Sequence, residues 1–172
     1  DAQFDDKPNV TLIAPNKAAM SAFFAFDRWP EGEAHIDLGG RMLTVMPTPG
    51  HHEESISVYD PQTQWLLTGD TLYPGYVYVK HWNAYETSIA RLVAFASVNE
   101  VGAVLGTHIE MPDEAGEYYP VGTTFQPNEA SLVLEPGDLA ALHAAISALD
   151  EPKKLTFNAF IVAPMNPLQK LI

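Results

Sequence analysis

Residues Thr48 to Gly75, TPGHHEESISVYDPQTQWLLTGDTLYPG, decide the fold prediction. Two adjacent histidines, His51 and His52, follow a Pro-Gly turn, where the backbone can bend sharply. Two runs of alternating or apolar residues then predict a pair of strands joined by a turn at residues 60–63. The second run ends at Asp70, directly after a Thr-Gly pair. A histidine and an aspartate are therefore expected at strand ends.

A third segment repeats this arrangement further along the chain. Residues 101–105 predict a buried strand, and a Gly-Thr pair followed by His108 comes directly after them. Ligand sites in α/β sheets form at strand ends, and imidazole and carboxylate groups are common metal ligands. His51, Asp70 and His108 therefore predict one metal site. For each residue alone, the alternative is a local role in a turn, a cap or the core. His52 is expected at the surface or behind the ligands.

The composition restricts the classes of function. The chain has 172 residues, enough for one domain with its own core. Its formal net charge of −13 repels phosphate backbones, so nucleic acid is not expected as a partner. It contains no cysteine, which excludes disulfides and thiolate zinc sites and leaves the compartment, cytoplasm or periplasm, open. An apolar run of about 18 residues does not occur, so no membrane span is expected.

The order of the predicted elements indicates a layered α/β architecture, with hairpins in the middle of the chain. Strands are expected at residues 10–14, 34–38, 42–46, 55–59, 64–67, 101–105 and 155–163, with a short extended piece at 76–80. Helices are expected at 17–24 after an Asn16 cap, behind a capping-box pattern at 83–86, and at 138–149. Residues 110–135 hold several Pro and Gly without a clear period, which predicts a long ordered loop.

Three motifs together resemble the later motifs of the metallo-β-lactamase superfamily: Thr48-Pro49-Gly50-His51, Thr68-Gly69-Asp70 and Gly106-Thr107-His108. The resemblance covers nearly the whole chain and implies an αββα sandwich with a two-metal site between its sheets. It also implies that His51 ligates one metal, that Asp70 bridges both, and that His108 ligates the other. Two Zn²⁺ ions are the implied cofactors, with iron or manganese as alternatives, and a metal-bound hydroxide is the implied nucleophile.

One motif of that family is missing from the sequence. HxHxDH, which supplies the remaining ligands, lies upstream of the first motif above, and the only histidine before His51 is His35. The chain begins at Asp1 instead of methionine, and Asp1 resembles the end of the segment that follows HxHxDH. We therefore expect residues 1–172 to form a single domain that is the C-terminal two-thirds of the family fold. Alone, it should be inactive and prone to associate, with the missing N-terminal segment or a second copy as its partner.

For the complete protein, the resemblance implies hydrolysis of a small ester, lactone or thioester. An aspartate at position 70 is similar to the glyoxalase II, lactonase and phosphodiesterase branches, whereas true β-lactamases usually have Cys or Ser there. Tyr73 lies where lactonase-like members place a tyrosine that hydrogen-bonds the substrate carbonyl or oxyanion. Asp70 and Tyr73 are therefore the candidate catalytic residues, and the alternative for Tyr73 is packing in the turn. Tyr76, Tyr78 and Trp82 either line a pocket mouth or pack together.

Other functions stay open at this point. Lys80 and Arg91 are the only basic residues between His51 and Lys153, so the basic cluster expected for a glutathione thioester is not evident. A glyoxalase II-type thioesterase or a β-lactamase is the nearest alternative. A non-catalytic binding or assembly module that keeps the fold is another, and a redox relative with a two-iron site is a third.

Overall fold

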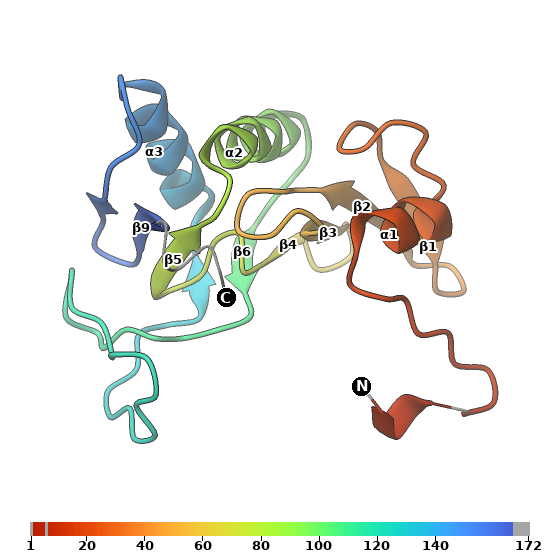
Figure 1. Cartoon of the computed structure of the whole chain (residues 1–172), viewed down its shortest axis with the longest axis horizontal. Helices are drawn as coiled ribbons and strands as arrows, with labels where there is room; N and C mark the ends of the chain where they lie inside the picture. Colours follow the sequence, from red (N-terminus) through yellow and green to blue (C-terminus); the bar gives the residue numbers. More distant parts are fainter. Residues whose placement is uncertain (1, 6, 167–172) are drawn as a thin grey trace.

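The strands of the computed structural model, which describes residues 2–5 and 7–166, form two sheets (Figure 1). The six-stranded sheet has the order β1-β2-β3-β4-β6-β7, and the three-stranded sheet has the order β5-β9-β8. The strands are β1 (Ala34–Asp37), β2 (Met42–Pro47), β3 (Ile56–Asp60), β4 (Trp65–Gly69), β5 (Tyr76–Val79), β6 (Ala103–Gly106), β7 (Val133–Leu134), β8 (Leu155–Thr156) and β9 (Ile161–Pro164). The helices are η1 (Ala2–Phe4), α1 (Lys17–Phe24), α2 (Trp82–Val98) and α3 (Pro136–Ser147).

The predicted hairpins form, and side chains close their turns. The Asp37 carboxylate accepts hydrogen bonds from the amides of Gly39 and Gly40 at 2.9 and 2.8 Å, at the turn between β1 and β2. Asp60 ends β3 and accepts from Thr63 in the next turn at 2.6 Å, and it also pairs with Arg41. The Arg41 guanidinium holds the pKa of Asp60 below its usual range. These local bonds explain why the register of β1 to β4 follows the sequence pattern.

The strand directions bring three strand ends to one edge of the larger sheet. β2, β3 and β4 are successively antiparallel, so β2 and β4 run the same way. β4 and β6 are parallel, with Gly69 opposite Gly106. The carboxyl ends of β2, β4 and β6 therefore lie at the same edge, which is the arrangement that the proposed metal site requires.

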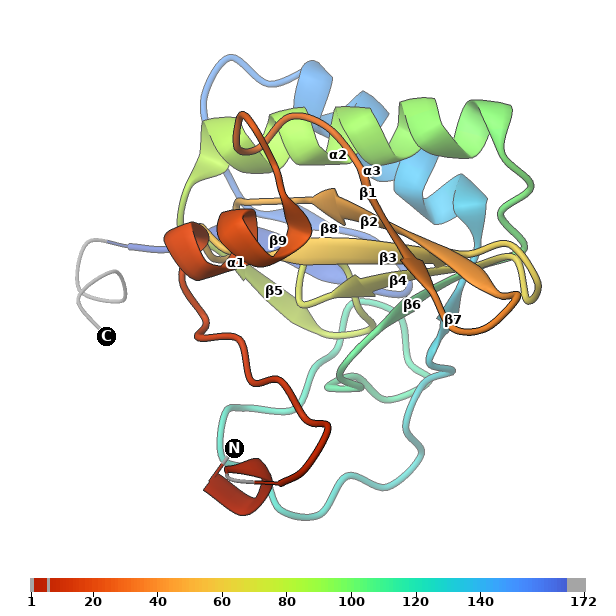
Figure 2. The same cartoon turned by 90° about the vertical axis from the view of Figure 1, so that its right-hand side faces the viewer.

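One face of the larger sheet packs on the helices, as Figure 2 shows for α2 and α3. Leu66 of β4 belongs to this buried face, together with the cross-strand neighbours Tyr59 and Val104. Residues one position away point to the opposite, outer face. There Leu67 is 39% exposed and Trp65 46% exposed, whereas Leu66 is fully buried. The outer face is thus an apolar surface that the described residues cover only in part.

Two expected elements at the start and the end of the chain differ from the prediction. Residues 10–14 form no strand within the described chain, and Val10 and Leu12 are exposed. A β-branched run without a neighbouring strand has nothing to pair with, and tertiary pairing decides strand formation. The single strand expected at 155–163 is a hairpin of β8 and β9, closed by a hydrogen bond from the Phe157 amide to the Phe160 carbonyl at 2.9 Å.

The two longer helices begin earlier than expected. The capping box predicted at 83–86 is wrong: α2 begins at Trp82, and the side chain of its N-cap residue, His81, makes no cap bond. The amides of Lys80 and His81 instead donate to the Gly50 carbonyl, which holds the chain in place before Asn83. α3 begins at Pro136, two residues earlier than predicted, with a capping box between Glu135 and Asp138.

The remaining predicted elements need smaller adjustments. α1 forms as expected, with the Asn16 side chain accepting from the Ala19 amide at 2.9 Å. The loop predicted at 110–135 contains the short strand β7, which pairs with β6. Asp1, expected to belong to the segment after HxHxDH, lies outside the described residues. Within the described part of the chain, each helix is too short or too polar to traverse a lipid bilayer.

The two faces of β4 predict different responses to the same substitution. Leu66→Ala should lower the free energy of unfolding by about 2–5 kcal/mol, because it leaves a cavity in the buried face. Leu67→Ala, the matched control on the outer face, should cost about 1 kcal/mol or less, because the side chain is partly exposed. Urea denaturation of both variants measures the difference. Equal losses would show that the outer face is covered in solution.

Candidate metal centre

The turn before His51 is held tightly against α2. Gly50 has a φ of 152°, and a Cβ at this position would lie 2.6 Å from the Cα of Tyr85, so only glycine fits. The carbonyl of Gly50 accepts the amides of Lys80 and His81 at 3.0 and 2.9 Å. These contacts position the backbone from which His51 projects.

The His51 ring has a defined tautomer. Its Nδ1 lies 2.7 Å from the carbonyl oxygen of Tyr78, and since a carbonyl only accepts, Nδ1 donates the proton. Nε2 is then free and lies 3.8 Å from Oδ2 of Asp70. The side chain is 15% exposed, and burial lowers the pKa of His51 below its ordinary value. A neutral imidazole with a free Nε2 and a hydrogen-bonded Nδ1 is the form in which histidine ligates metals.

Asp70 lies between the two predicted histidine ligands. Its Oδ1 is 3.0 Å from Nε2 of His108, whereas Oδ2 faces His51. Thr107, next to His108 in the chain, donates its hydroxyl to the same Oδ1. The Asp70 and His108 side chains are 38% and 50% exposed, so this side of the cluster is open to solvent. The structure therefore brings all three predicted ligands together.

Tyr73 packs behind His108 and has little contact with solvent. Its ring centroid is 5.2 Å from that of His108. A Cβ on Gly106 would lie 2.3 Å from the Cβ of Tyr73, so glycine is needed where β6 ends. The Tyr73 hydroxyl donates to the Tyr76 carbonyl at 2.8 Å and lies 3.3 Å from Oε2 of Glu110. Burial, with Glu110 adding to it, raises the pKa of Tyr73, so the hydroxyl stays protonated. Its predicted oxyanion role stays a prediction.

Three contacts in this cluster were not foreseen from the sequence. The Thr107 hydroxyl lies beside a predicted ligand in one of the motifs, so its position was a usable signal. The Tyr78 carbonyl is a backbone group 27 residues from His51 in the chain, and Glu110 is 37 residues from Tyr73. Neither of those contacts has a sequence signal. His52 is exposed and contacts the His51 ring edge to face, which agrees with a surface position.

The donor atoms fit a metal ion in kind but not in number. Two imidazoles and one carboxylate are suitable ligands, and the tautomer of His51 is the right one. The part of the chain that the structure describes nevertheless contains no group of three or more His, Asp or Glu side chains arranged to hold a metal ion. A centre with two metals would need further donors. The cluster is therefore an incomplete donor set.

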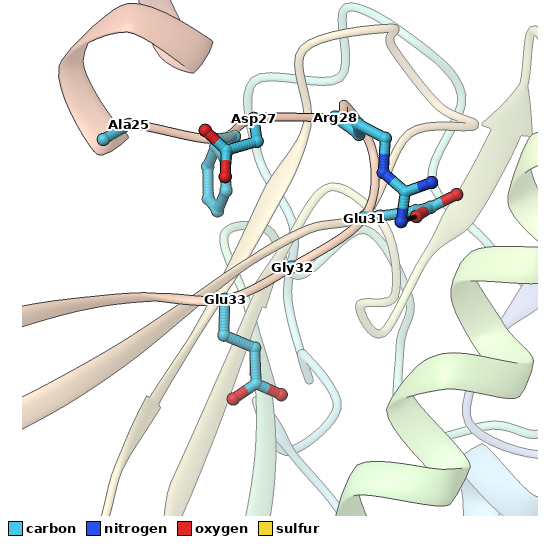
Figure 3. A pocket seen from close by; sticks show the side chains of 7 residues that line it. Ala25, Asp27, Arg28, Glu31, Gly32 and Glu33 are labelled. Atoms are coloured by element: carbon cyan, nitrogen blue, oxygen red, sulfur yellow. Dashed lines mark ion pairs between the residues drawn. The ribbon is translucent and has the colours of Figure 1, made fainter.

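A pocket of about 240 Å³ lies away from this cluster, in the loop between α1 and β1 (Figure 3). Its lining includes Arg28 and Glu31, which form an exposed ion pair at 2.7 Å. Figure 3 shows the Asp27 and Glu33 carboxylates pointing in other directions. Because its charged groups do not converge, this pocket is not the candidate site.

Comparison with known proteins identifies the family. A sequence profile of the metallo-beta-lactamase superfamily matches residues 5–145. The chain belongs to this superfamily. The predicted family and α/β fold class are confirmed, and the match includes the segments that hold His51, Asp70 and His108.

Curated relatives match part of the chain. An acyl-coenzyme A thioesterase MBLAC2 from Gallus gallus is 35% identical over 85 residues, which cover 47% of this chain and 30% of the relative. The Homo sapiens protein of the same name is 48% identical over 40 residues, 23% of this chain and 14% of the relative. The matched stretches thus cover less than a third of these relatives.

Two solved structures also match part of the chain. An archaeal metallo-beta-lactamase superfamily protein from Sulfolobus tokodaii superposes with a TM-score of 0.44 at 18% identity, covering 73% of this chain and 41% of that one. A metallo-beta-lactamase from Pontibacter korlensis gives a TM-score of 0.42 at 14% identity, covering 69% of this chain and 47% of that one. The family assignment rests on the profile match.

The close approach at Gly106 yields a stability prediction. Gly106→Ala should lower the free energy of unfolding by about 1–3 kcal/mol, because the new methyl group overlaps Tyr73. Gly137→Ala is the matched control, since a Cβ there meets nothing within 4 Å. It lies in the first turn of α3 and should stabilise the protein by about 0.5–1 kcal/mol. Denaturant unfolding measures both, and a neutral Gly106→Ala would contradict the packing described.

Proposed function

We propose that the protein that contains this sequence is a metal-dependent hydrolase acting on an ester or thioester. The observation that supports this most directly is the position of Asp70, whose two carboxylate oxygens face Nε2 of His51 and Nε2 of His108. Opposed imidazoles on either side of one carboxylate suit a metal-binding role, and superfamily membership supports the same interpretation. Zinc is the expected metal, since the superfamily generally binds it.

Each residue of the cluster has a distinct task in this proposal. His51, Asp70 and His108 would hold the metal. The Tyr78 carbonyl holds His51 in the ligating tautomer, and Thr107 orients the Asp70 carboxylate. A bound metal would lower the pKa of water and stabilise negative charge on the substrate oxygen.

The residue types and the names of the relatives support a proposal for the substrate class. An aspartate at position 70 favours ester, lactone or thioester hydrolysis over β-lactam hydrolysis, as the resemblance implies. Curated relatives named acyl-coenzyme A thioesterase favour a thioester among these. We therefore propose an acyl thioester as the first substrate to test, with lactones and simple esters as alternatives of related chemistry.

The described residues hold no group of three or more His, Asp or Glu side chains arranged for a metal, so this proposal needs further donors. We propose that they are contributed by an upstream segment or by a second copy of the chain. The outer face of the larger sheet supports this proposal, since Trp65 and Leu67 are large apolar side chains that remain partly exposed. A protein layer placed there would cover them.

The ligand assignment predicts how zinc binding responds to substitution. His108→Ala should weaken Zn²⁺ binding by at least about tenfold, because removing even a residue that only hydrogen-bonds a metal ligand costs that much. His35→Ala is the control: His35 is exposed on β1 and is not part of the cluster. Competition against a chromogenic chelator measures the affinity without any assay of activity. Equal effects of the two substitutions would show that Zn²⁺ binds elsewhere.

The proposed reaction predicts a large effect of Asp70→Asn. This change keeps the shape of the side chain but removes its charge, so kcat/KM for an acyl-coenzyme A thioester should fall by about a hundredfold or more. The measurement is the release of thiol by the natural protein that contains this chain, assayed with added zinc. Glu86→Gln, a change of equal charge at an exposed position of α2, should leave the rate unaltered. Thiol release at full rate by Asp70→Asn would refute the mechanism.

A further inference from the structure

β5 has two faces of opposite character. Val77 and Val79 are buried in the core. Tyr76 and Tyr78 alternate with them, so their side chains lie on the other face, where both are half-buried. The two tyrosine rings contact each other, with centroids 4.6 Å apart. This face of β5 is therefore an aromatic surface.

Two further residues extend this surface from distant parts of the chain. Tyr118, in the loop after β6, is 40% exposed, and its ring centroid lies 4.9 Å from that of Tyr76. The Nζ of Lys154, which precedes β8, lies 5.3 Å from the centroid of Tyr76 and 5.9 Å from that of Tyr118. We call Tyr76, Tyr78, Tyr118 and Lys154 the tyrosine–lysine surface.

The tyrosine–lysine surface is attached directly to the candidate metal centre. β5 is an edge strand of its sheet. On the side that faces β9, the carbonyls of Gly75 and Val79 accept hydrogen bonds from the amides of Ile161 and Met165. The intervening carbonyls of Tyr76 and Tyr78 accept hydrogen bonds from Tyr73 at 2.8 Å and from His51 at 2.7 Å. β5 thus presents its aromatic rings on one face, and the carbonyls along its edge bind His51 and Tyr73.

The charge on this surface is unusual for the chain. The protein has a net charge of −13, and the ion pairs found among the described residues do not include Lys154. Its ammonium group therefore attracts an anion without competition from a paired carboxylate. The faces of tyrosine rings stack on planar groups. Burial raises the pKa of Tyr76 and Tyr78, so both hydroxyls stay neutral and can donate.

We propose that the tyrosine–lysine surface binds a phosphorylated aromatic group, such as a nucleotide. This group would be the part of the substrate that lies away from the cleaved bond. The planar ring would stack on the exposed Tyr118, and the phosphate would approach Lys154. The Glu110 carboxylate accepts a hydrogen bond from Tyr73, and Lys154 is the cation of the surface, so the negative end of the ligand is directed toward the lysine. The role in substrate recognition rests on the proposed function, whereas binding itself does not.

Adenosine 5′-monophosphate is the probe that tests this proposal. Calorimetric titration of the chain in the presence of a metal chelator excludes any contribution from a bound metal. Adenosine and inorganic phosphate serve as half-ligands. The monophosphate should bind about tenfold more tightly than either, because only it offers both stacking and charge pairing. No detectable binding of the monophosphate, or equal affinity for either half-ligand, would overturn the proposal.

Substitutions on the surface separate the two contributions. Lys154→Gln should weaken monophosphate binding by about tenfold and leave adenosine binding unchanged, because only the charge pairing is lost. Tyr118→Ala should weaken both ligands by about tenfold through lost stacking, and Tyr118→Phe should restore binding. Lys153→Gln is the matched control, since Lys153 is also exposed, and the lysine–ring contacts found among the described residues are made by Lys154.

If Lys153→Gln and Lys154→Gln weakened monophosphate binding equally, the effect would reflect only the net charge of the protein, and the assignment to Lys154 would be overturned. Both tested side chains are exposed, so the variants should fold, and thermal unfolding verifies this. Because the titration needs neither metal nor hydrolysis, its failure leaves the proposed reaction untouched. Conversely, if the protein bound the monophosphate but hydrolysed no thioester, only the proposed function would be contradicted.

Discussion

The parallel pairing of β4 with β6 is the constraint on which the candidate site depends. Gly69 and Gly106 lie opposite each other at the ends of these strands, so the residues that follow, Asp70 and His108, emerge side by side. The pairing also requires β6 to end without a side chain, because Tyr73 and the Leu72 carbonyl occupy the space beside Gly106. A longer side chain there would move His108 away from the carboxylate.

The edge of β5 provides the second constraint. In most proteins an exposed strand edge with free carbonyls is a liability. Here the carbonyls of Tyr76 and Tyr78 are used by Tyr73 and His51, which fixes one imidazole tautomer and one phenol orientation. The same strand also holds the aromatic rings of the tyrosine–lysine surface. The four residues of β5 therefore contact both the cluster and the surface beside it.

Electrostatics explain why this cluster suits a cation. The chain is strongly acidic, and burial disfavours the protonated form of His51, so its Nε2 offers a lone pair. Arg91, one of the few basic residues in this part of the sequence, donates to the carbonyls of Pro30, Gly32 and Pro47 and so serves to hold the loop before β1 against α2. Lys154, in contrast, lies against the rings of Tyr76 and Tyr118.

The sequence by itself determined the features that depend on local order. The turns at Asp37 and Asp60 set the hairpins, and the three motifs carry the resemblance to the family. Features that depend on partners distant in the chain required the tertiary structure. Residues 10–14 have the composition of a strand but lack a neighbour, and α2 begins at Trp82 because Gly50 anchors the preceding amides. The contact of His51 with a carbonyl 27 residues away, and the meeting of Tyr76 with Tyr118 and Lys154, arise only when β5, the long loop and β8 pack together. Sequence patterns report which face of an element is buried, but they do not report which other element lies against it.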